Sequence, residues 1–270
     1  MPLPKIIYLL TDFGFEGQHY VAQLRGVLQK LGPADCRIED LTHAVNPFSI
    51  IQAEYFLLST FPYLQTPCIV IAVVDPGVGS SRDIVAIKDK DGNCFIGPNN
   101  GVFGRFPPKT TIGDIRKIEN PKVIPTFRSA TFQGRDIMAP AAAALANGFP
   151  FEDLGPQSGP LLVNELPDPE ITKHVVTGGI YSIDTFGNII TNISAPIIEK
   201  SGLEGGTIIH VQVNGVNRAF EYGKTFSDVQ AAGHVAYIGS TLFFELAVNC
   251  GSAASLFRCK IGDHIRLEWG

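Results

Sequence analysis

The sequence has few charged residues, and no segment concentrates charge of one sign. Charged residues make up 17% of the 270 positions, and 21 basic against 26 acidic residues give a formal net charge of −5 at pH 7. Because there is no run of lysine or arginine, the sequence predicts no basic patch that could bind a phosphate backbone, so we expect no nucleic-acid partner. No apolar stretch approaches the roughly 18 residues that span a bilayer, so we expect no membrane partner. The N-terminus lacks the cleavage site of a signal peptide, which predicts a cytoplasmic protein.

Motifs for metal binding are also missing. The five cysteines are an odd number without any C-x-x-C spacing, and the six histidines form no H-x-x-x-H pair. Zinc sites are built from clustered ligands with such spacings. We therefore expect buried, inert thiols and no metal site.

Apolar residues are plentiful, at 45% of the chain. A chain of this length slightly exceeds what one core usually supports, so we expect two unequal domains. In the first half, strand-like runs alternate with helical spacing, which predicts an α/β domain with a mainly parallel sheet over residues 1–158. Asn46 and Pro47 are expected as N-cap and first residue of one helix. The expected strands are 6–10, 36–41 and 68–74, with a hairpin at 83–88 and 93–96, and the expected helices are 20–31, 48–61 and 139–147.

The composition changes after residue 158. Gly159-Pro160 and Pro167-Asp168-Pro169 mark a linker over residues 159–171. Residues 172–270 contain strand-length runs separated by Gly, Asn and Ser turns, with no convincing helix. We therefore predict a smaller, antiparallel all-β domain at the C-terminal end.

Two carboxylates are expected at one rim of the first domain. Asp12 and Asp75 each follow a predicted buried strand, and the carboxyl ends of parallel strands line the ligand crevice of such sheets. Asp12 could accept hydrogen bonds from a ribose diol, or it could cap the helix that follows. Arg82 lies beyond Asp75 across a glycine-bearing turn. The two could pair and fix a water or an anion, or they could form a plain surface ion pair.

Four other side chains could contact a ligand. Gln133 precedes an Ala-rich helix and could orient a nucleophile, but it could not take up its proton. Phe186 could stack on a purine and Asn188 could read its edge, although the same loop also fits a plain turn with an Asx cap. Glu245 lies inside an apolar run, so it should be paired or face a polar ligand.

Seven segments, in their order along the chain, resemble the S-adenosyl-L-methionine (SAM) hydroxide adenosyltransferase family, which is related to the fluorinase and the chlorinase. The family has an α/β domain followed by a β-barrel-like domain. It also implies a homotrimer whose active sites lie between the N-terminal domain of one subunit and the C-terminal domain of the next. The segments are Thr11-Asp12-Phe13-Gly14, Asp40-Leu41-Thr42-His43, Val74 to Gly79, Gly97 to Gly101, Thr131 to Asp136, Phe186-Gly187-Asn188, and Glu245 to Asn249.

The resemblance implies substrate-binding residues in both domains. Asp12 would hold the ribose hydroxyls, and Phe48 would pack against the sugar. Glu245 occupies a recurrent family position to which we assign no contact. In the C-terminal domain, the residues implied for adenine are Phe186, Asn188 and Phe226, and those implied for the methionine end are Asp184 and Ser240.

The resemblance also implies a triad of Asp, Arg and His that handles the attacking water in hydrolytic members. Asp75 and Arg82 match the first two positions, and Gln133 stands where the histidine is expected. His19 is the nearest histidine in the first motif, in a loop one residue longer than usual, and nothing in the sequence makes it a replacement.

The activity that the resemblance implies is hydrolysis of SAM to adenosine and L-methionine by in-line attack of water at the 5′ carbon. SAM is then the substrate, and no cofactor is required. Asp75 would steer the proton of the water while Arg82 holds the geometry. Gln133 could keep the hydrogen bond of a histidine but not its change of charge, so the activity could be reduced. One alternative is a weakened protein that only binds SAM or adenosine. The other is a 5′-halo-5′-deoxyadenosine synthase, which the charge of Asp75 disfavours.

Overall fold

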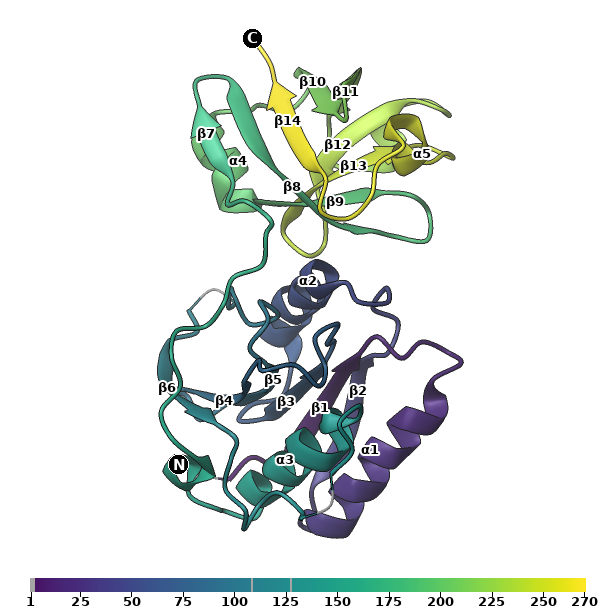
Figure 1. The fold of residues 1–270 in the computed structure, drawn as a ribbon. Helices are drawn as coiled ribbons and strands as arrows, with labels where there is room; N and C mark the ends of the chain where they lie inside the picture. Colours follow the sequence, from purple (N-terminus) through teal and green to yellow (C-terminus); the bar gives the residue numbers. More distant parts are fainter. Residues whose placement is uncertain (1–2, 108, 127) are drawn as a thin grey trace. The chain divides into compact units, whose positions relative to one another are not determined.

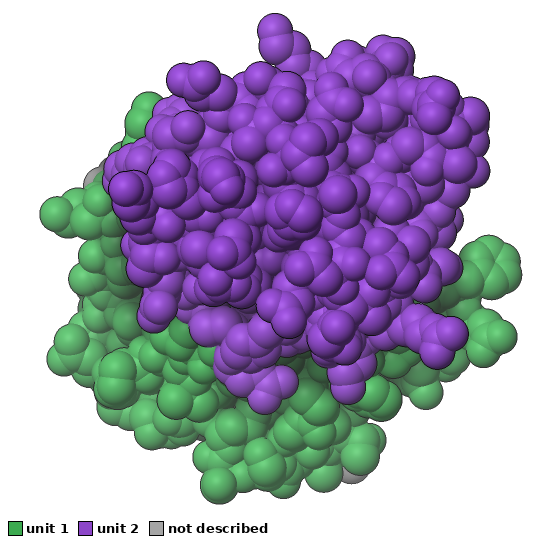
Figure 2. All heavy atoms as spheres, turned by 90° about the horizontal axis from the view of Figure 1, so that it is seen from above, with its two compact units in different colours: residues 1–164 green, residues 165–270 purple. Residues whose placement is uncertain are grey.

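The computed structural model describes residues 3–107, 109–126 and 128–270. The helices and strands are labelled in Figure 1. The chain forms two compact units, residues 1–164 and residues 165–270, which are coloured separately in Figure 2. Among the described residues, no helix has the length and apolarity needed to cross a membrane.

Six strands form the sheet of the N-terminal unit, in the order β2-β1-β3-β5-β4-β6. β1 runs parallel to β2 and β3, and β3 runs parallel to β5, whereas β4 is antiparallel to both β5 and β6. The sheet is therefore mixed, and the prediction of a mainly parallel sheet is wrong. The strands are β1 (Ile6–Thr11), β2 (Arg37–Thr42), β3 (Ile69–Val73), β4 (Ile84–Asp89), β5 (Cys94–Pro98) and β6 (Ile112–Lys117).

The reversed direction of β4 comes from its tight connection to β5. Asp89 Oδ1 accepts hydrogen bonds from the amides of Asp91, at 2.9 Å, and Asn93, at 2.8 Å, so the chain turns back at once. A connection this short joins only antiparallel neighbours, because a parallel pair needs a crossover of about a dozen residues or more. The hairpin that the sequence predicts here is confirmed.

Helices cover both faces of this sheet (Figure 1). α1 (Gln18–Leu31) and α3 (Ala139–Ala146) share one apolar core with Ile7 and Leu9 of β1. α2 (Ile50–Thr60) shares the opposite core with the alternate residues of β1, because successive side chains of a strand point to opposite faces. Shorter helical segments are the 3-10 helices Phe61–Tyr63 and Phe151–Leu154 and the π-helical turn Gly134–Met138, which leads into α3.

α2 begins later than the sequence indicates. Its N-cap is Ser49, whose hydroxyl accepts a hydrogen bond from the Gln52 amide at 3.3 Å, so the expected start at Asn46 and Pro47 is wrong. Phe48 has a φ of 68°, in the left-handed region, and a right-handed helix cannot include such a residue. Pro47 and Phe48 therefore belong to the preceding loop.

Seven strands of the C-terminal unit close into a barrel. The ring runs β8-β9-β13-β12-β11-β10-β14, and β14 pairs with β8 to close it. The predicted barrel is confirmed. Its neighbours are antiparallel except for β11 and β12, which run parallel. The ring strands are β8 (Val175–Ile183), β9 (Ile189–Ser194), β10 (Ile208–Val213), β11 (Val216–Tyr222), β12 (His234–Ile238), β13 (Phe243–Val248) and β14 (His264–Glu268), and β7 (Glu170–Thr172) pairs with β8 outside the ring.

Two short helices accompany the barrel, so the prediction of an all-β domain is wrong in part. They are α4 (Ala195–Ser201) and α5 (Ala253–Phe257), and a 3-10 helix spans Phe226–Asp228. Helices of this length are shorter than the eight or so residues over which a helical period becomes visible in a sequence.

α5 holds the loop between β8 and β9. The Ala254 amide donates a hydrogen bond to the Gly187 carbonyl at 2.9 Å. A Cβ at Gly187 would lie 2.1 Å from Ser252 Oγ, and its φ of 82° also favours glycine. The loop that carries Phe186 and Asn188 is therefore fixed against the start of α5.

Candidate functional site

A cleft of about 310 Å³ opens in the N-terminal unit. Asp12 follows β1, Asp75 follows β3, and Gln133 directly precedes the π-helical turn, so the cleft forms where parallel strands end. Of the predicted site residues, Asp12, Phe48, Asp75 and Gln133 line it together. The other lining residues are mostly apolar, namely Phe13, Tyr20, Pro47, Val73, Val78, Thr131, Phe132, Gly134 and Met138.

Asp75 and Arg82 form a buried ion pair at this cleft. Arg82 Nε donates a hydrogen bond to Asp75 Oδ1 at 2.8 Å, and Arg82 Nη2 donates to Asp75 Oδ2. The side chain of Arg82 is 9% exposed and that of Asp75 is 5% exposed, so the contact is not a surface ion pair. Bidentate pairing of this kind fixes the plane of the carboxylate. Arg82 Nη1 is also buried, and it makes no hydrogen bond to any described residue.

Gln133 joins this pair as a third member. Its side-chain oxygen accepts a hydrogen bond from Arg82 Nη2. Its amide nitrogen has no partner among the described residues, and the residue lines the cleft. The side chain can therefore donate a hydrogen bond to a bound molecule, but it cannot change its charge as a histidine does.

Asp12 contacts the loop before α2 and does not cap a helix. Its Oδ2 accepts a hydrogen bond from the Phe48 amide at 2.8 Å, whereas α1 has Gly17 as its N-cap with no side-chain cap. Phe48 beside it is 69% exposed. Burial raises the pKa of Asp12 and the charge of Asp75 adds to this, while the Phe48 hydrogen bond opposes the rise.

The raised pKa of Asp12 has a consequence for stability. Such a carboxyl contributes stability that is present below its unfolded pKa, near 4, and is lost as the pH rises through the folded value. We therefore expect Asp12→Asn to raise the thermal midpoint of the ligand-free protein at pH 7 by a few degrees, and to change it less at pH 4. Thermal unfolding at both pH values tests this, with the exposed Glu152→Gln as control. An equal difference at the two pH values would contradict it.

Three aromatic rings that are not among the predicted site residues form a wall of the cleft. The ring of Phe132 lies 5.8 Å from that of Phe13 and 5.4 Å from that of Tyr20, both edge to face. Tyr20 begins the predicted helix 20–31, in which apolar residues recur at helical spacing, a pattern typical of core residues. His19 packs beside Tyr20, with ring centroids 3.9 Å apart, but does not line the cleft. His19 therefore does not supply the missing histidine.

A second cleft, of about 440 Å³, lies in the C-terminal unit. The three residues implied for adenine, Phe186, Asn188 and Phe226, line it together with residues 248–251. Phe186 is 77% exposed and Phe226 is 39% exposed. Asn188 donates its side-chain amide to Asp184 Oδ2 at 2.8 Å, which leaves its side-chain oxygen without a described partner.

Asp184, Ser240 and Glu245 do not line this second cleft. Asp184 accepts hydrogen bonds from the amides of Phe186, at 2.9 Å, and Asn188, at 2.8 Å, so the loop is also the Asx turn that the sequence allowed. Burial, reinforced by the charge of Asp184, raises the pKa of Glu245 despite a hydrogen bond from Tyr237. Ser240 is exposed in the turn between β12 and β13.

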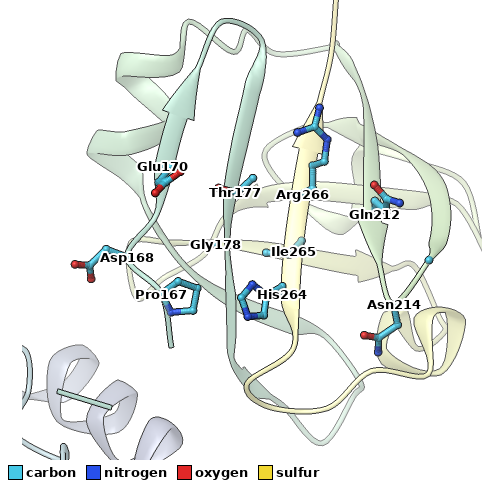
Figure 3. Close-up of a pocket in the computed structure, with 11 residues that line it drawn as sticks. Pro167, Asp168, Glu170, Thr177, Gly178, Gln212, Asn214, His264, Ile265 and Arg266 are labelled. Atoms are coloured by element: carbon cyan, nitrogen blue, oxygen red, sulfur yellow. The ribbon is translucent and has the colours of Figure 1, made fainter. Parts of the chain in front are cut away.

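A third hollow, of about 450 Å³, lies on strands β7, β8, β10 and β14 (Figure 3). Acidic side chains, Asp168 and Glu170, lie on one flank, His264 and Arg266 lie on β14, and amides lie on the other flank. None of the predicted site residues is here, and the mixed charges favour no single ligand. Within the described ranges, no group of three or more His, Cys, Asp or Glu residues could hold a metal ion.

Comparisons with known proteins agree along the whole chain. The N-terminal domain of the SAM hydroxide adenosyltransferase family matches residues 7–155, and the C-terminal domain matches residues 178–266. A protein named (R)-S-adenosyl-L-methionine hydrolase, from Thermus thermophilus, is 36% identical over 97% of this chain and 98% of its own. A crystal structure of an uncharacterized conserved protein from Thermotoga maritima has a TM-score of 0.88 and 33% identity, and the match covers 97% of this chain and 99% of that chain.

A fluorinase from Nocardia brasiliensis is less similar, with 27% identity over 98% of this chain and 97% of its own. The hydrolase and the fluorinase thus match over nearly their full lengths, and the hydrolase matches better. With both domains matched in order, this chain belongs to the SAM hydroxide adenosyltransferase family.

Proposed function

We propose that this protein hydrolyses SAM to adenosine and L-methionine. The observation that carries the proposal is the buried ion pair of Asp75 and Arg82, whose carboxylate faces a cleft shared with Asp12 and Gln133. The 36% identical relative from Thermus thermophilus supports it, because that protein is named as a hydrolase of SAM. Since its name specifies the R configuration, we propose the R sulfonium epimer as the substrate.

The reaction needs a nucleophile held in line behind a good leaving group. The sulfonium of SAM provides the leaving group, because the electron pair of the breaking bond between C5′ and sulfur neutralises the positive charge. Water attacks C5′ and its proton passes to Asp75, which then releases it to solvent. Arg82 holds the carboxylate with two hydrogen bonds, and the Gln133 amide orients the water.

The two clefts together offer groups for the rest of the substrate. In the N-terminal unit, Asp12 would bind the ribose hydroxyls and Phe48 would pack against the sugar. In the C-terminal unit, Phe186 and Phe226 would enclose the adenine ring. The unpartnered side-chain oxygen of Asn188 suits the exocyclic amine.

Asp184 and Ser240 are proposed for the methionine end, and no cofactor is required. We also propose a homotrimer whose active sites lie between the N-terminal unit of one subunit and the C-terminal unit of the next. The high exposure of Phe48 and Phe186 in a single chain supports a site shared in this way.

Product analysis separates this proposal from its alternatives. The protein is incubated with each sulfonium epimer of SAM, with and without chloride, and the products are resolved by chromatography. Adenosine and methionine in equal amounts support hydrolysis, whereas 5′-chloro-5′-deoxyadenosine in the chloride sample would indicate a halogenating enzyme. Tight binding of SAM without any product would indicate a binding protein.

The effect of Gln133 can be measured by restoring the histidine. If a titrating group helps to move the water's proton, Gln133→His should raise kcat about tenfold or more. It should also make kcat depend on pH near neutrality. Gln133→Asn, which shortens the side chain and keeps the amide, is the matched control and should lower kcat. An unchanged rate and profile in Gln133→His would show that this position only orients the water.

A further inference from the structure

Two motif segments of the N-terminal unit are joined by a chain of polar contacts that the proposed reaction does not use. Thr11 and His43 are its most buried members, whereas Asp40 and Arg25 are partly exposed. The Thr11 hydroxyl lies 2.9 Å from His43 Nδ1 and accepts a hydrogen bond from the Phe13 amide at 3.3 Å. His43 Nε2 lies 3.0 Å from Asp40 Oδ1, and Arg25 contacts the same oxygen at 2.6 Å. The chain thus runs from α1, through the end of β2, to the residues that flank Asp12.

The direction of the hydrogen bonds follows from the charges. The negative charge of Asp40 beside His43 Nε2 favours a proton on that nitrogen. The interaction of Asp40 with Nε2 is one of charge and not an aligned hydrogen bond, since Nε2 makes no hydrogen bond to a described residue. Nδ1 is then free to accept the proton of the Thr11 hydroxyl. Thr11 therefore donates to His43 and accepts from Phe13, so both functions of its hydroxyl are used.

The order Thr-His-Asp is that of a nucleophile with its base and orienting acid. The burial of Thr11 excludes this role, because its exposed fraction is 0% and it does not line the cleft. A hydroxyl that is enclosed and hydrogen-bonded on both sides cannot reach a substrate. Its function must be to hold the backbone around it.

The backbone that it holds is the turn that carries Asp12. The Phe13 amide is bound by Thr11, and the Gly14 amide donates to the His43 carbonyl at 2.7 Å. Asp12 itself is bound to the loop after His43 through the Phe48 amide. Side chain and main chain of His43 therefore both fix the turn, directly beside the carboxylate.

We propose that Thr11 and His43 are positioning residues that hold Asp12 in the orientation in which it binds the ribose hydroxyls. The inference rests on the proposed function, in which Asp12 contacts the sugar. It gives the motif Asp40-Leu41-Thr42-His43 a role in ligand binding, although none of its residues lines the cleft.

Adenosine binding to Thr11 variants tests the proposal. Thr11→Val keeps the shape of the side chain but removes the hydroxyl, and it leaves the Phe13 amide and His43 Nδ1 without partners. We expect it to raise the dissociation constant of adenosine, measured by calorimetry, about tenfold. Thr11→Ser keeps the hydroxyl and should stay within about twofold of the wild type.

A second background shows whether Thr11 acts through Asp12. In Asp12→Asn protein, Thr11→Val should weaken adenosine binding by less than about twofold, because the carboxylate that it positions is gone. The same loss in both backgrounds, or equal binding by the Val and Ser variants, would overturn the inference. If Thr11→Val does not fold, His43→Asn and His43→Leu give the same comparison, since only asparagine retains an acceptor near Nδ1.

The outcomes also separate this inference from the proposed function. Wild-type protein that binds adenosine and hydrolyses SAM, with a Thr11→Val variant that binds equally well, overturns the inference alone. Wild-type protein that neither binds adenosine nor forms it from SAM overturns both.

Discussion

Replacing Asp75 with asparagine should lower kcat for SAM hydrolysis by about 10²- to 10⁴-fold. Asparagine has the same shape and keeps an oxygen for Arg82 Nε, but it cannot accept the proton of the attacking water. The affinity for adenosine should change little, because adenosine lacks the reacting bond and Asp12 is intact. Release of adenosine from SAM gives the rate, and calorimetry gives the affinity.

The matched control for Asp75→Asn is Asp83→Asn. Asp83 also pairs with a cation, Lys117 at 2.9 Å, but it does not line the cleft, so its replacement should leave kcat within about twofold. Full activity in Asp75→Asn would remove Asp75 from the mechanism. A loss of adenosine affinity as large as the loss of rate would make Asp75 a binding residue instead.

Replacing Arg82 with methionine should lower the thermal midpoint by about 10 °C as well as reduce kcat. The substitution leaves the carboxylate of Asp75, which is 5% exposed, without its counter-charge. An uncompensated buried charge costs about 3–5 kcal/mol, and each kcal/mol shifts the midpoint of a protein of this size by about 2–4 °C. Thermal unfolding at pH 7 measures the effect.

Two further variants isolate the unpaired charge as the cause. Asp75→Asn combined with Arg82→Met should restore much of the thermal midpoint that Arg82→Met alone loses, because no buried charge then lacks a partner. Arg266→Met breaks an exposed ion pair with Glu268, and such pairs contribute less than about 1 kcal/mol. Equal losses of thermal midpoint in Arg82→Met and Arg266→Met would show that the unpaired charge of Asp75 does not cause the destabilisation.

The position of the two carboxylates could be predicted from the sequence. Asp12 and Asp75 each follow an apolar run, and parallel strands end at one edge of a sheet, so a shared cleft was expected. The contact of Arg82 with Gln133 could not be predicted from spacing, because it joins residues that are 51 positions apart. Gln133 was a candidate because of its place before an Ala-rich helix and in a motif that resembles the family's.

Other features depend on tertiary packing that a linear pattern does not record. Tyr20 has the spacing of a core residue, and only the approach of Phe132 from another segment turns it into a wall of the cleft. The turn at Asp89 indicates that β4 is antiparallel to β5, whereas the alternation of strands and helices favoured a mainly parallel sheet. α4 and α5 are too short to show a period.

The closure of the barrel limits how the C-terminal unit can associate. Among the described residues, β7, with three residues, is an edge strand outside the ring, and β11 is paired with β12 only at Glu221 with Val235 and Tyr222 with Ala236, so the open edges are short. An open sheet edge is a template for strand addition by another chain, and short edges are poor templates. We therefore expect partners of this unit to be recognised through side chains and loops, and we expect little edge-to-edge aggregation.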